Sequence, residues 1–292
     1  MAYRFVPADA SVQDAVRRIA AGQLARALRS LSGPEGHAPA AIHGVRKSVK
    51  KLRGLIRLAR PGFRDYDREN AALRGVGHSL SALRDSDVMA QTLANLADGT
   101  MAFPTLAAAL ADEGAARRDP AAIAAAIGAA EATLRDIAAR APHWRIRGEG
   151  FDTPARALAR SHAAAARAMG RLTSPPRPEE IHDWRKRAKD VLYQMQLIEP
   201  FWPALLSVRV RETGRLTEIL GEFNDIAVLM TRAAATPLPA DEAMHLETRA
   251  GLRQAELLAG ALPLGRRLLA GDPAAMAALW TDLWRIWRSE GG

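Results

Sequence analysis

Apolar residues recur every three or four positions along almost the whole chain, which is the spacing of one face of an α-helix. The alternation with a period of two that is typical of strands is absent from the pattern. Clusters of Gly, Pro, Asp and Ser interrupt the helical pattern at 32–39, 61–63, 98–104, 118–120, 141–154, 173–178, 236–239 and 271–273. About ten helices fit between these breaks, so the sequence predicts an all-α protein.

One helical stretch occurs twice. IHGVRKSVKKLRGLIRLARP at 42–61 returns as IHDWRKRAKDVLYQMQLIEP at 181–200, with seven identities at an offset of 139. A second pair, LSALRDSDV at 80–88 and LGEFNDIAV at 220–228, places Asp85 and Asp225 at an offset of 140. The repeat predicts a single domain over 1–292, built from two pseudo-symmetric helical bundles at approximately 1–145 and 150–292. Such an arrangement brings the two repeated helices to one central groove.

Each repeated stretch separates cations from apolar residues when it is placed on a helix of 100° per residue. The apolar arc holds Val45, Val49, Leu52, Ile56 and Ala59 in the first copy, and Trp184, Ala188, Val191, Met195 and Ile198 in the second. The opposite arc holds His43, Arg46, Lys47, Lys50, Arg53 and Arg57 in the first copy, and His182, Arg185, Lys186 and Lys189 in the second. Because the second stripe is shorter, the first helix is expected to hold an anion more strongly.

A basic stripe on a single helix is usually only a solvated face. Here the stripe is repeated, and like charges three, four and seven residues apart repel one another unless an anion binds. Over twenty residues the helix is about 30 Å long, so the charges form a track that suits a linear polyanion. The chain has 41 Lys and Arg against 32 Asp and Glu, a formal charge of +9, which favours polyanionic partners.

Composition excludes several classes of protein. There is no cysteine, so disulfides, thiol catalysis and thiolate metal sites are excluded. The N-terminus does not have the pattern of a signal peptide, and no apolar run is long enough to span a bilayer. A cytoplasmic protein without membrane insertion is therefore expected.

The paired motifs, IHGVRKSVKKLR with SALRDSDV and IHDWRKRAKDVLY with LGEFNDIAV, resemble the CHAD family, the conserved histidine α-helical domain. The resemblance covers nearly the whole chain, from 3–24 to the final helix. It implies two antiparallel four-helix bundles with a central basic groove that binds inorganic polyphosphate without hydrolysing it, with association to polyphosphate granules left open. The motif residues that carry over are His43, Arg46, Lys47, Lys50 and Arg53 in the first half, and His182, Arg185, Lys186, Lys189 and Tyr193 in the second.

The second half departs from the family pattern at two positions. Leu192 stands where a basic residue usually precedes the tyrosine, and Asp190 stands opposite Lys51 of the first half. A weaker second half-site is expected. Four more arginines either add cations to the groove or are simply exposed to solvent. They are Arg160 and Arg167 in 156–171, and Arg211 and Arg215 in 209–215.

The two histidines have two open roles. His43 and His182 could donate to phosphate oxygens, or they could be structural and bind a neighbouring carbonyl or carboxylate. Asp85 and Asp225 are the candidate carboxylates for orienting a histidine or a cation.

Two other functions use the same residues. The pair His182–Asp183, with His43, His78, Asp85 and Asp225, could form a metal-dependent phosphohydrolase, but the surrounding cations disfavour a divalent ion. No P-loop and no ExExK strand of the triphosphate-tunnel enzymes occurs, so a non-enzymatic protein without cofactor or metal is expected. Nucleic-acid backbone binding is the main alternative, although only 5% of residues are aromatic and none interleaves the basic stripes for base stacking. Oligomeric state and polyphosphate chain-length preference are left open.

Overall fold

The computed structural model describes residues 3–32, 39–80, 85–97, 102–116, 119–148 and 150–291. In these ranges the protein forms eleven α-helices and three short 3₁₀ turns, without any strand. The predicted all-α class is confirmed. The α-helices are α1 (Val12–Ser32), α2 (Pro39–Ala59), α3 (Tyr66–Ser79), α4 (Asp85–Leu96), α5 (Pro104–Ala116), α6 (Pro120–Arg140), α7 (Asp152–Gly170), α8 (Pro178–Ile198), α9 (Pro203–Ala234), α10 (Ala240–Leu268) and α11 (Pro273–Glu290).

Proline begins six of these helices, at α2, α5, α6, α8, α9 and α11. A proline is tolerated there because the first residues of a helix have no intrahelical acceptor for an N–H group. Asp119 and Asp272 precede two of these prolines, and their carboxylates accept hydrogen bonds from Ala121 N (2.9 Å) and Ala275 N (2.7 Å). The breaks seen in the sequence therefore act as helix starts with a local chemical cause.

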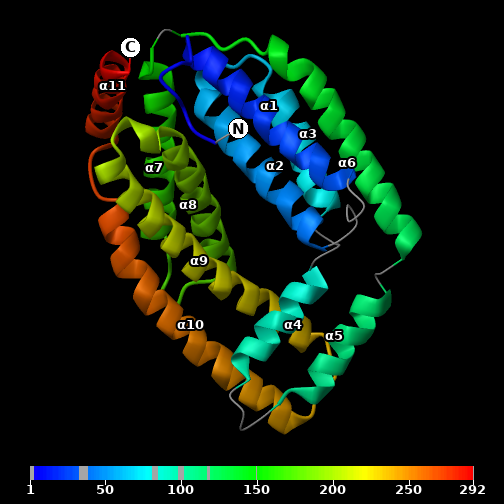
Figure 1. Ribbon diagram of the computed structural model, residues 1–292. Helices are drawn as coiled ribbons and strands as arrows, with labels where there is room; N and C mark the ends of the chain where they lie inside the picture. Colours follow the sequence, from blue (N-terminus) through cyan, green and yellow to red (C-terminus); the bar gives the residue numbers. More distant parts are fainter. Residues whose placement is uncertain are drawn as a thin grey trace.

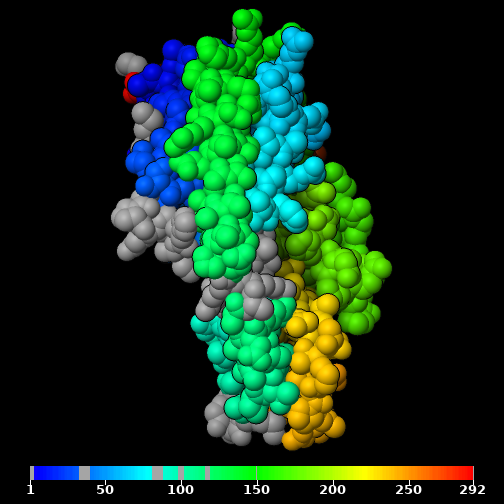
Figure 2. All heavy atoms as spheres, turned by 90° about the vertical axis from the view of Figure 1, so that its right-hand side faces the viewer, coloured from blue at the N-terminus to red at the C-terminus, as the bar shows by residue number. Residues whose placement is uncertain are grey.

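The helices α1, α2, α3 and α6 pack on one another as one bundle, and α7 packs on α8 and α11 (Figure 1). The short helices α4 and α5 lie instead with α9 and α10. Glu242 of α10 accepts hydrogen bonds from Thr105 N and Leu106 N at the start of α5, and Arg232 of α9 pairs with Glu113 of α5 at 2.7 Å. In Figure 2, α5 continues below α6 and lies beside the yellow segment where α9 ends and α10 begins. The predicted boundary at 145–150 stays a prediction.

The two repeated helices, α2 and α8, have 21 residues each, and their bounds match at the offset of 139. They bury the predicted apolar arcs, and α2 packs against α1 and α3 as α8 packs against α7 and α9. The two helices also contact each other. At their crossing, a Cβ added to Gly54 would lie 2.7 Å from Tyr193 Cβ, so only glycine permits this approach. Gly54 and Tyr193 are equivalent positions of the repeat; the symmetry of the two bundles stays a prediction.

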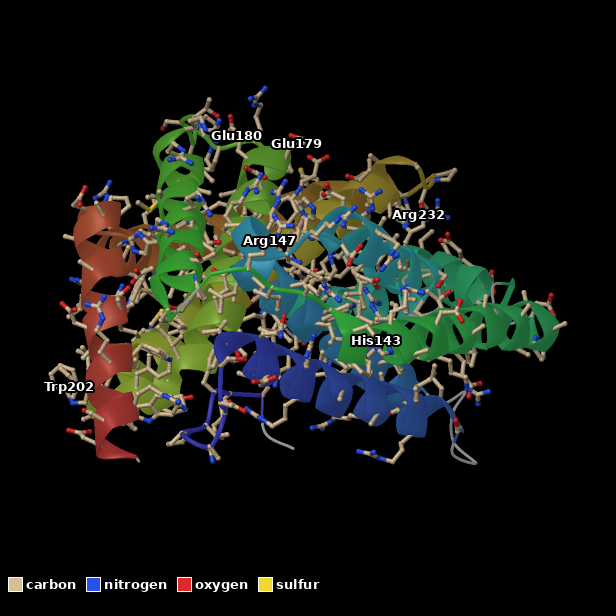
Figure 3. All side chains as sticks on the ribbon, turned by 90° about the horizontal axis from the view of Figure 1, so that it is seen from above. His143, Arg147, Glu179, Glu180, Trp202 and Arg232 are labelled. Atoms are coloured by element: carbon tan, nitrogen blue, oxygen red, sulfur yellow. The ribbon has the colours of Figure 1, made fainter. Side chains whose placement is uncertain are left out.

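Two extended segments connect the bundles near the C-terminal ends of α2 and α8. The hydroxyl of Tyr3 donates to Lys51 O (2.8 Å), and Phe5 N donates to Leu197 O (3.0 Å). Arg147, labelled in Figure 3, lies on the connection between α6 and α7. Its backbone N–H donates to Gly62 O at 2.9 Å. The N-terminal segment therefore contacts both α2, through Tyr3, and α8, through Phe5. Within the described residues, no helix is both long and apolar enough to cross a bilayer.

Candidate polyanion-binding cleft

A cleft of about 750 Å³ lies between α2 and α8, and α4 and α9 complete its walls. We call it the cationic cleft. Eight of the fifteen residues predicted as binding residues line it, and they come from both copies of the repeat: His43, Arg46, Lys47, Lys50, His182, Arg185, Lys189 and Tyr193. The fold therefore brings together side chains that are about 140 residues apart in the sequence.

The α2 wall presents its cations to solvent. His43, Lys47 and Lys50 are exposed, and Arg46 is half-buried. Their spacing of three, four and seven residues places them on one face, about one helical turn apart. Exposed cations keep much of their hydration, so this wall attracts an anion mainly through long-range electrostatics.

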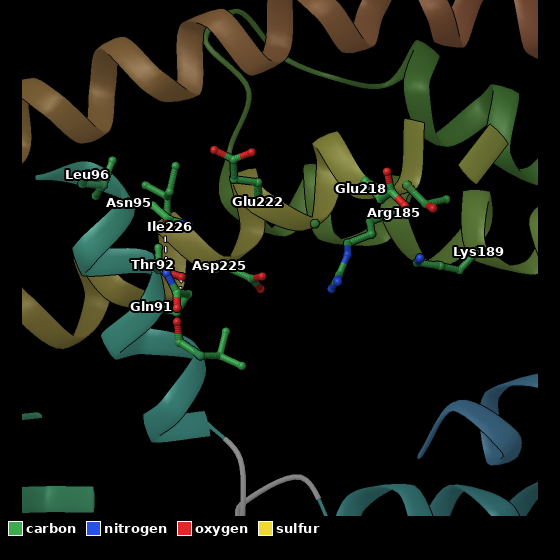
Figure 4. A pocket seen from close by; sticks show the side chains of 13 residues that line it. Gln91, Thr92, Asn95, Leu96, Arg185, Lys189, Glu218, Glu222, Asp225 and Ile226 are labelled. Atoms are coloured by element: carbon green, nitrogen blue, oxygen red, sulfur yellow. Dashed lines mark hydrogen bonds between the residues drawn. The ribbon is translucent and has the colours of Figure 1, made fainter. Parts of the chain in front are cut away.

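The α8 wall holds a half-buried arginine. The guanidinium of Arg185 packs against Gly221 of α9, where an added Cβ would lie 3.3 Å from Arg185 Nη2. Among the described residues, the buried Nε of Arg185 has no hydrogen-bond partner. A buried donor without an acceptor costs about 1–3 kcal/mol, and an anion in the cleft would recover that cost. Figure 4 labels Arg185 beside Lys189, Glu218 and Asp225 on the wall that α8 and α9 form.

Lys189 is the second desolvated cation of α8. Burial lowers the pKa of Lys189 below the ordinary lysine value of 10.5, and the nearby charges of Arg185 and Lys47 lower it further, whereas Glu218 raises it. Lys47 belongs to α2, so the positive charges of the two helices repel one another across the cleft. A bound polyanion would relieve this repulsion.

Tyr193 contributes a neutral hydroxyl. Burial raises the pKa of the Tyr193 phenol, against an opposing effect from Arg185. The phenol therefore keeps its proton and can donate a hydrogen bond to a phosphate oxygen.

The α9 wall carries acids. Glu218 and Asp225 line the cationic cleft, and Glu222 lies one turn away and pairs with Arg253 at 2.7 Å. The carboxylates do not contact His182. Instead, Nδ1 of His182 lies 2.7 Å from Oδ1 of Asn224. The hydrogen-bond partner of His182 Nδ1 is therefore the amide of Asn224, a residue that the sequence pattern did not single out. That Asp225 orients a histidine or a cation stays a prediction. The side chain of Asp85 lies outside the described residues.

The chain can be compared with known proteins through its sequence and its fold. The sequence model of the CHAD domain matches residues 12–234. The chain belongs to the CHAD domain family. The crystal structure of the CHAD domain from the plant Ricinus communis matches with a TM-score of 0.67 at 20% identity, over 92% of this chain and 94% of that chain. At this identity the likeness shows the fold alone. No curated protein matches the sequence.

Seven predicted residues of this CHAD domain do not line the cationic cleft. Arg53 donates through Nε to Asn70 Oδ1 (3.1 Å), and burial and the neighbouring charges of Arg57 and Arg74 lower its pKa. Arg57 forms an ion pair with Asp190 of α8. The other five are exposed to solvent: Arg160, Arg167, Lys186, Arg211 and Arg215. Whether these side chains bind an anion stays a prediction.

The acids that the structure describes can be compared with the arrangement that a metal ion requires. In the part of the chain that the structure describes, no three His, Asp or Glu side chains are grouped closely enough to hold a metal ion. Lys186 and Arg187 instead approach Asp183, at 3.9 Å and 3.5 Å, so the carboxylate of the predicted HD pair faces cations.

Proposed function

We propose that this CHAD domain binds inorganic polyphosphate along the cationic cleft and does not hydrolyse it. One observation carries the proposal. Two copies of the same basic motif, far apart in the sequence, converge on one cleft. There Lys189 is desolvated among other cations, and Arg185 Nε has no hydrogen-bond partner among the residues that the structure describes.

The two walls support different parts of the binding. The exposed cations of α2 raise the local concentration of a polyanion, and their bound counterions are released when phosphates replace them. Arg185 and Lys189 are half-buried, so their hydrogen bonds to phosphate compete less with water. Arginine can also bind two phosphate oxygens at once, which adds geometric selection to the charge.

A linear polymer suits the cleft better than a compact metabolite. The helix α2 is 21 residues long, which corresponds to about 30 Å. Its cations continue beyond the cleft to Arg53 and Arg57, although Arg57 is already paired with Asp190. A chain of phosphates can follow such a row, whereas a single small anion uses only part of it.

The surroundings of the acids support binding without hydrolysis. Glu222 forms an ion pair with Arg253. Glu218 lies close enough to Lys189 to raise the pKa of the Lys189 ammonium. A carboxylate that is already held in an ion pair is less available to orient a water molecule for attack on a phosphate.

The proposal is tested by titrating the purified protein with long-chain polyphosphate, with duplex DNA as competitor, while orthophosphate release is assayed. We expect tight binding that DNA does not displace and no released phosphate. Preferential binding of DNA would instead support a nucleic-acid function. Phosphate release that a chelator stops would support a metal-dependent hydrolase. Microscopy of labelled protein in cells that contain polyphosphate granules checks whether the same binding directs it there.

A further inference from the structure

A second pocket of about 570 Å³ adjoins the cationic cleft. We call it the side pocket. The two open into one another, because five residues from α4, α8 and α9 line both: Val88, Arg185, Lys189, Glu218 and Asp225. Figure 4 shows the side pocket between α4, which carries Gln91 and Asn95, and the α8–α9 pair. Its volume lies in the range of ordinary small-molecule sites.

The charge changes sign from the cleft to the side pocket. Among the described residues that line the side pocket, Arg185 and Lys189, which it shares with the cleft, are the cations. Its α9 wall carries the carboxylates of Glu218, Glu222 and Asp225. Additional phosphates would be repelled there, so a phosphate chain should end near Arg185. The neighbouring space favours a neutral group that donates hydrogen bonds.

The remaining walls offer both polar and apolar contacts. Gln91 Nε2 donates to Asn95 Oδ1 at 2.9 Å, which leaves the carbonyl oxygen of Gln91 and the amide N–H groups of Asn95 side by side for a ligand. Leu96 and Ile226 are buried and add apolar surface. An amide pair of this kind matches the adjacent donor and acceptor on the edge of a purine.

We propose that the side pocket takes the nucleoside of a purine nucleoside triphosphate, with its phosphates extending past Arg185 and Lys189 toward Lys47 of α2. The carboxylates of the α9 wall accept hydrogen bonds from the ribose hydroxyls, a role that acidic residues commonly have at ribose. The two ends of the ligand then match the two ends of the site. The phosphates lie at the cations, and the ribose hydroxyls, which donate hydrogen bonds, lie at the carboxylates. This inference rests on the proposed phosphate binding in the cationic cleft.

The first test compares ATP with tripolyphosphate by calorimetry in the same metal-free buffer. Tripolyphosphate has the same number of phosphates without the nucleoside, and its higher charge favours it on electrostatic grounds. Two or three hydrogen bonds to the nucleoside predict that ATP binds about tenfold more tightly. Equal affinities, or tighter binding of tripolyphosphate, would overturn the inference and leave polyphosphate binding intact.

Two variants locate the contacts. Gln91→Leu combined with Asn95→Leu should remove the preference for ATP and leave the affinity for tripolyphosphate unchanged; both side chains are exposed, so the fold should tolerate the change. Lys47→Gln should weaken both ligands by the same factor. If the Leu double variant keeps the preference for ATP, the nucleoside does not lie in the side pocket. If the wild-type protein binds neither ligand nor polyphosphate, the proposed function itself fails.

Discussion

The two helices that face the cationic cleft carry the same motif but present it differently. On α2, His43, Lys47 and Lys50 are exposed to solvent. On α8, Arg185 and Lys189 are half-buried, because α9 packs over them with Gly221 beneath the guanidinium and Glu218 near the ammonium. Repetition of a sequence therefore does not give two equal half-sites, since the neighbouring helices decide how much water each cation keeps.

This difference changes the expectation from the sequence. The longer stripe of α2 predicts that the first helix holds the anion more strongly, and its total charge supports that view. Burial predicts instead that each half-buried cation of α8 binds phosphate more strongly than each exposed cation of α2, because a hydrogen bond to phosphate is stronger where water competes less. The two views can be separated by changing one helix at a time.

The largest effect is expected when both walls are reversed in charge. Lys50→Glu combined with Lys189→Glu should weaken polyphosphate binding at least about 100-fold, because each wall then repels phosphate at close range. Isothermal calorimetry measures the loss, and circular dichroism checks that helicity is retained.

The matched control for that variant is Arg145→Glu combined with Arg147→Glu, on the connection between α6 and α7. Both side chains are exposed, neither lines the cleft, and the change in net charge is the same. Binding should fall by less than about threefold, as expected for a weak, screened effect. An equal loss in both double variants would mean that net charge, and not the cleft, determines binding.

Single substitutions compare the two walls directly. Arg185→Gln should weaken polyphosphate binding about 10-fold or more, because it removes a charge-assisted hydrogen bond in a desolvated position. Lys47→Gln should cost only about twofold to fivefold, as for an exposed ion pair. Affinities at two salt concentrations should show that the Lys47 effect disappears at high salt while the Arg185 effect persists. Equal losses, screened equally by salt, would contradict the distinction between the walls.

The sequence predicted the helical class and the cleft for identifiable reasons. Periodicity of three and four residues and the prolines at helix starts define the elements, and the repeated basic arcs define which faces of α2 and α8 meet. Eight predicted residues reach the cleft because both helices turn the same arc toward each other. These signals are local, or they repeat in the sequence, so they can be read from the sequence alone.

Other features depend on contacts that the sequence does not encode locally. Arg57 continues the basic arc of α2, but Asp190 of α8 neutralises it, and this pairing requires the crossing angle of the two helices. The contact of His182 with Asn224 likewise depends on the register between α8 and α9. The packing of α4 and α5 against α9 and α10 follows from long-range contacts such as Glu242 with Leu106 N.

A smaller effect is expected at the crossing of α2 and α8. Gly54→Ala adds a methyl group that would lie 2.7 Å from Tyr193 Cβ, which is too close, so the two helices must move apart. We expect a loss of about 1–3 kcal/mol in the free energy of unfolding and a few-fold weaker binding as the walls move apart. Gly214→Ala in α9 is the control: nothing lies within 4 Å of its added Cβ, so it should stabilise the protein by up to about 1 kcal/mol. A stabilised Gly54→Ala variant would contradict the close approach.

The smallest effect is a pH dependence that distinguishes Lys189 from the exposed cations. Burial lowers the pKa of Lys189, and polyphosphate favours its protonated form, so affinity is fully present below that pKa and falls as the pH rises through it. The stability of the free protein changes with pH in the opposite direction. The unfolded chain binds the Lys189 proton more readily than the folded protein does, so the free energy of unfolding rises with pH over the same window. Affinities measured from about pH 7 to about pH 10 should decline by about twofold to threefold.

The control variant Lys189→Arg keeps the positive charge throughout this pH range and should flatten the decline in affinity. If Lys189→Arg and the wild-type protein show the same pH profile, the titrating group lies elsewhere, and the desolvated position of Lys189 does not control binding.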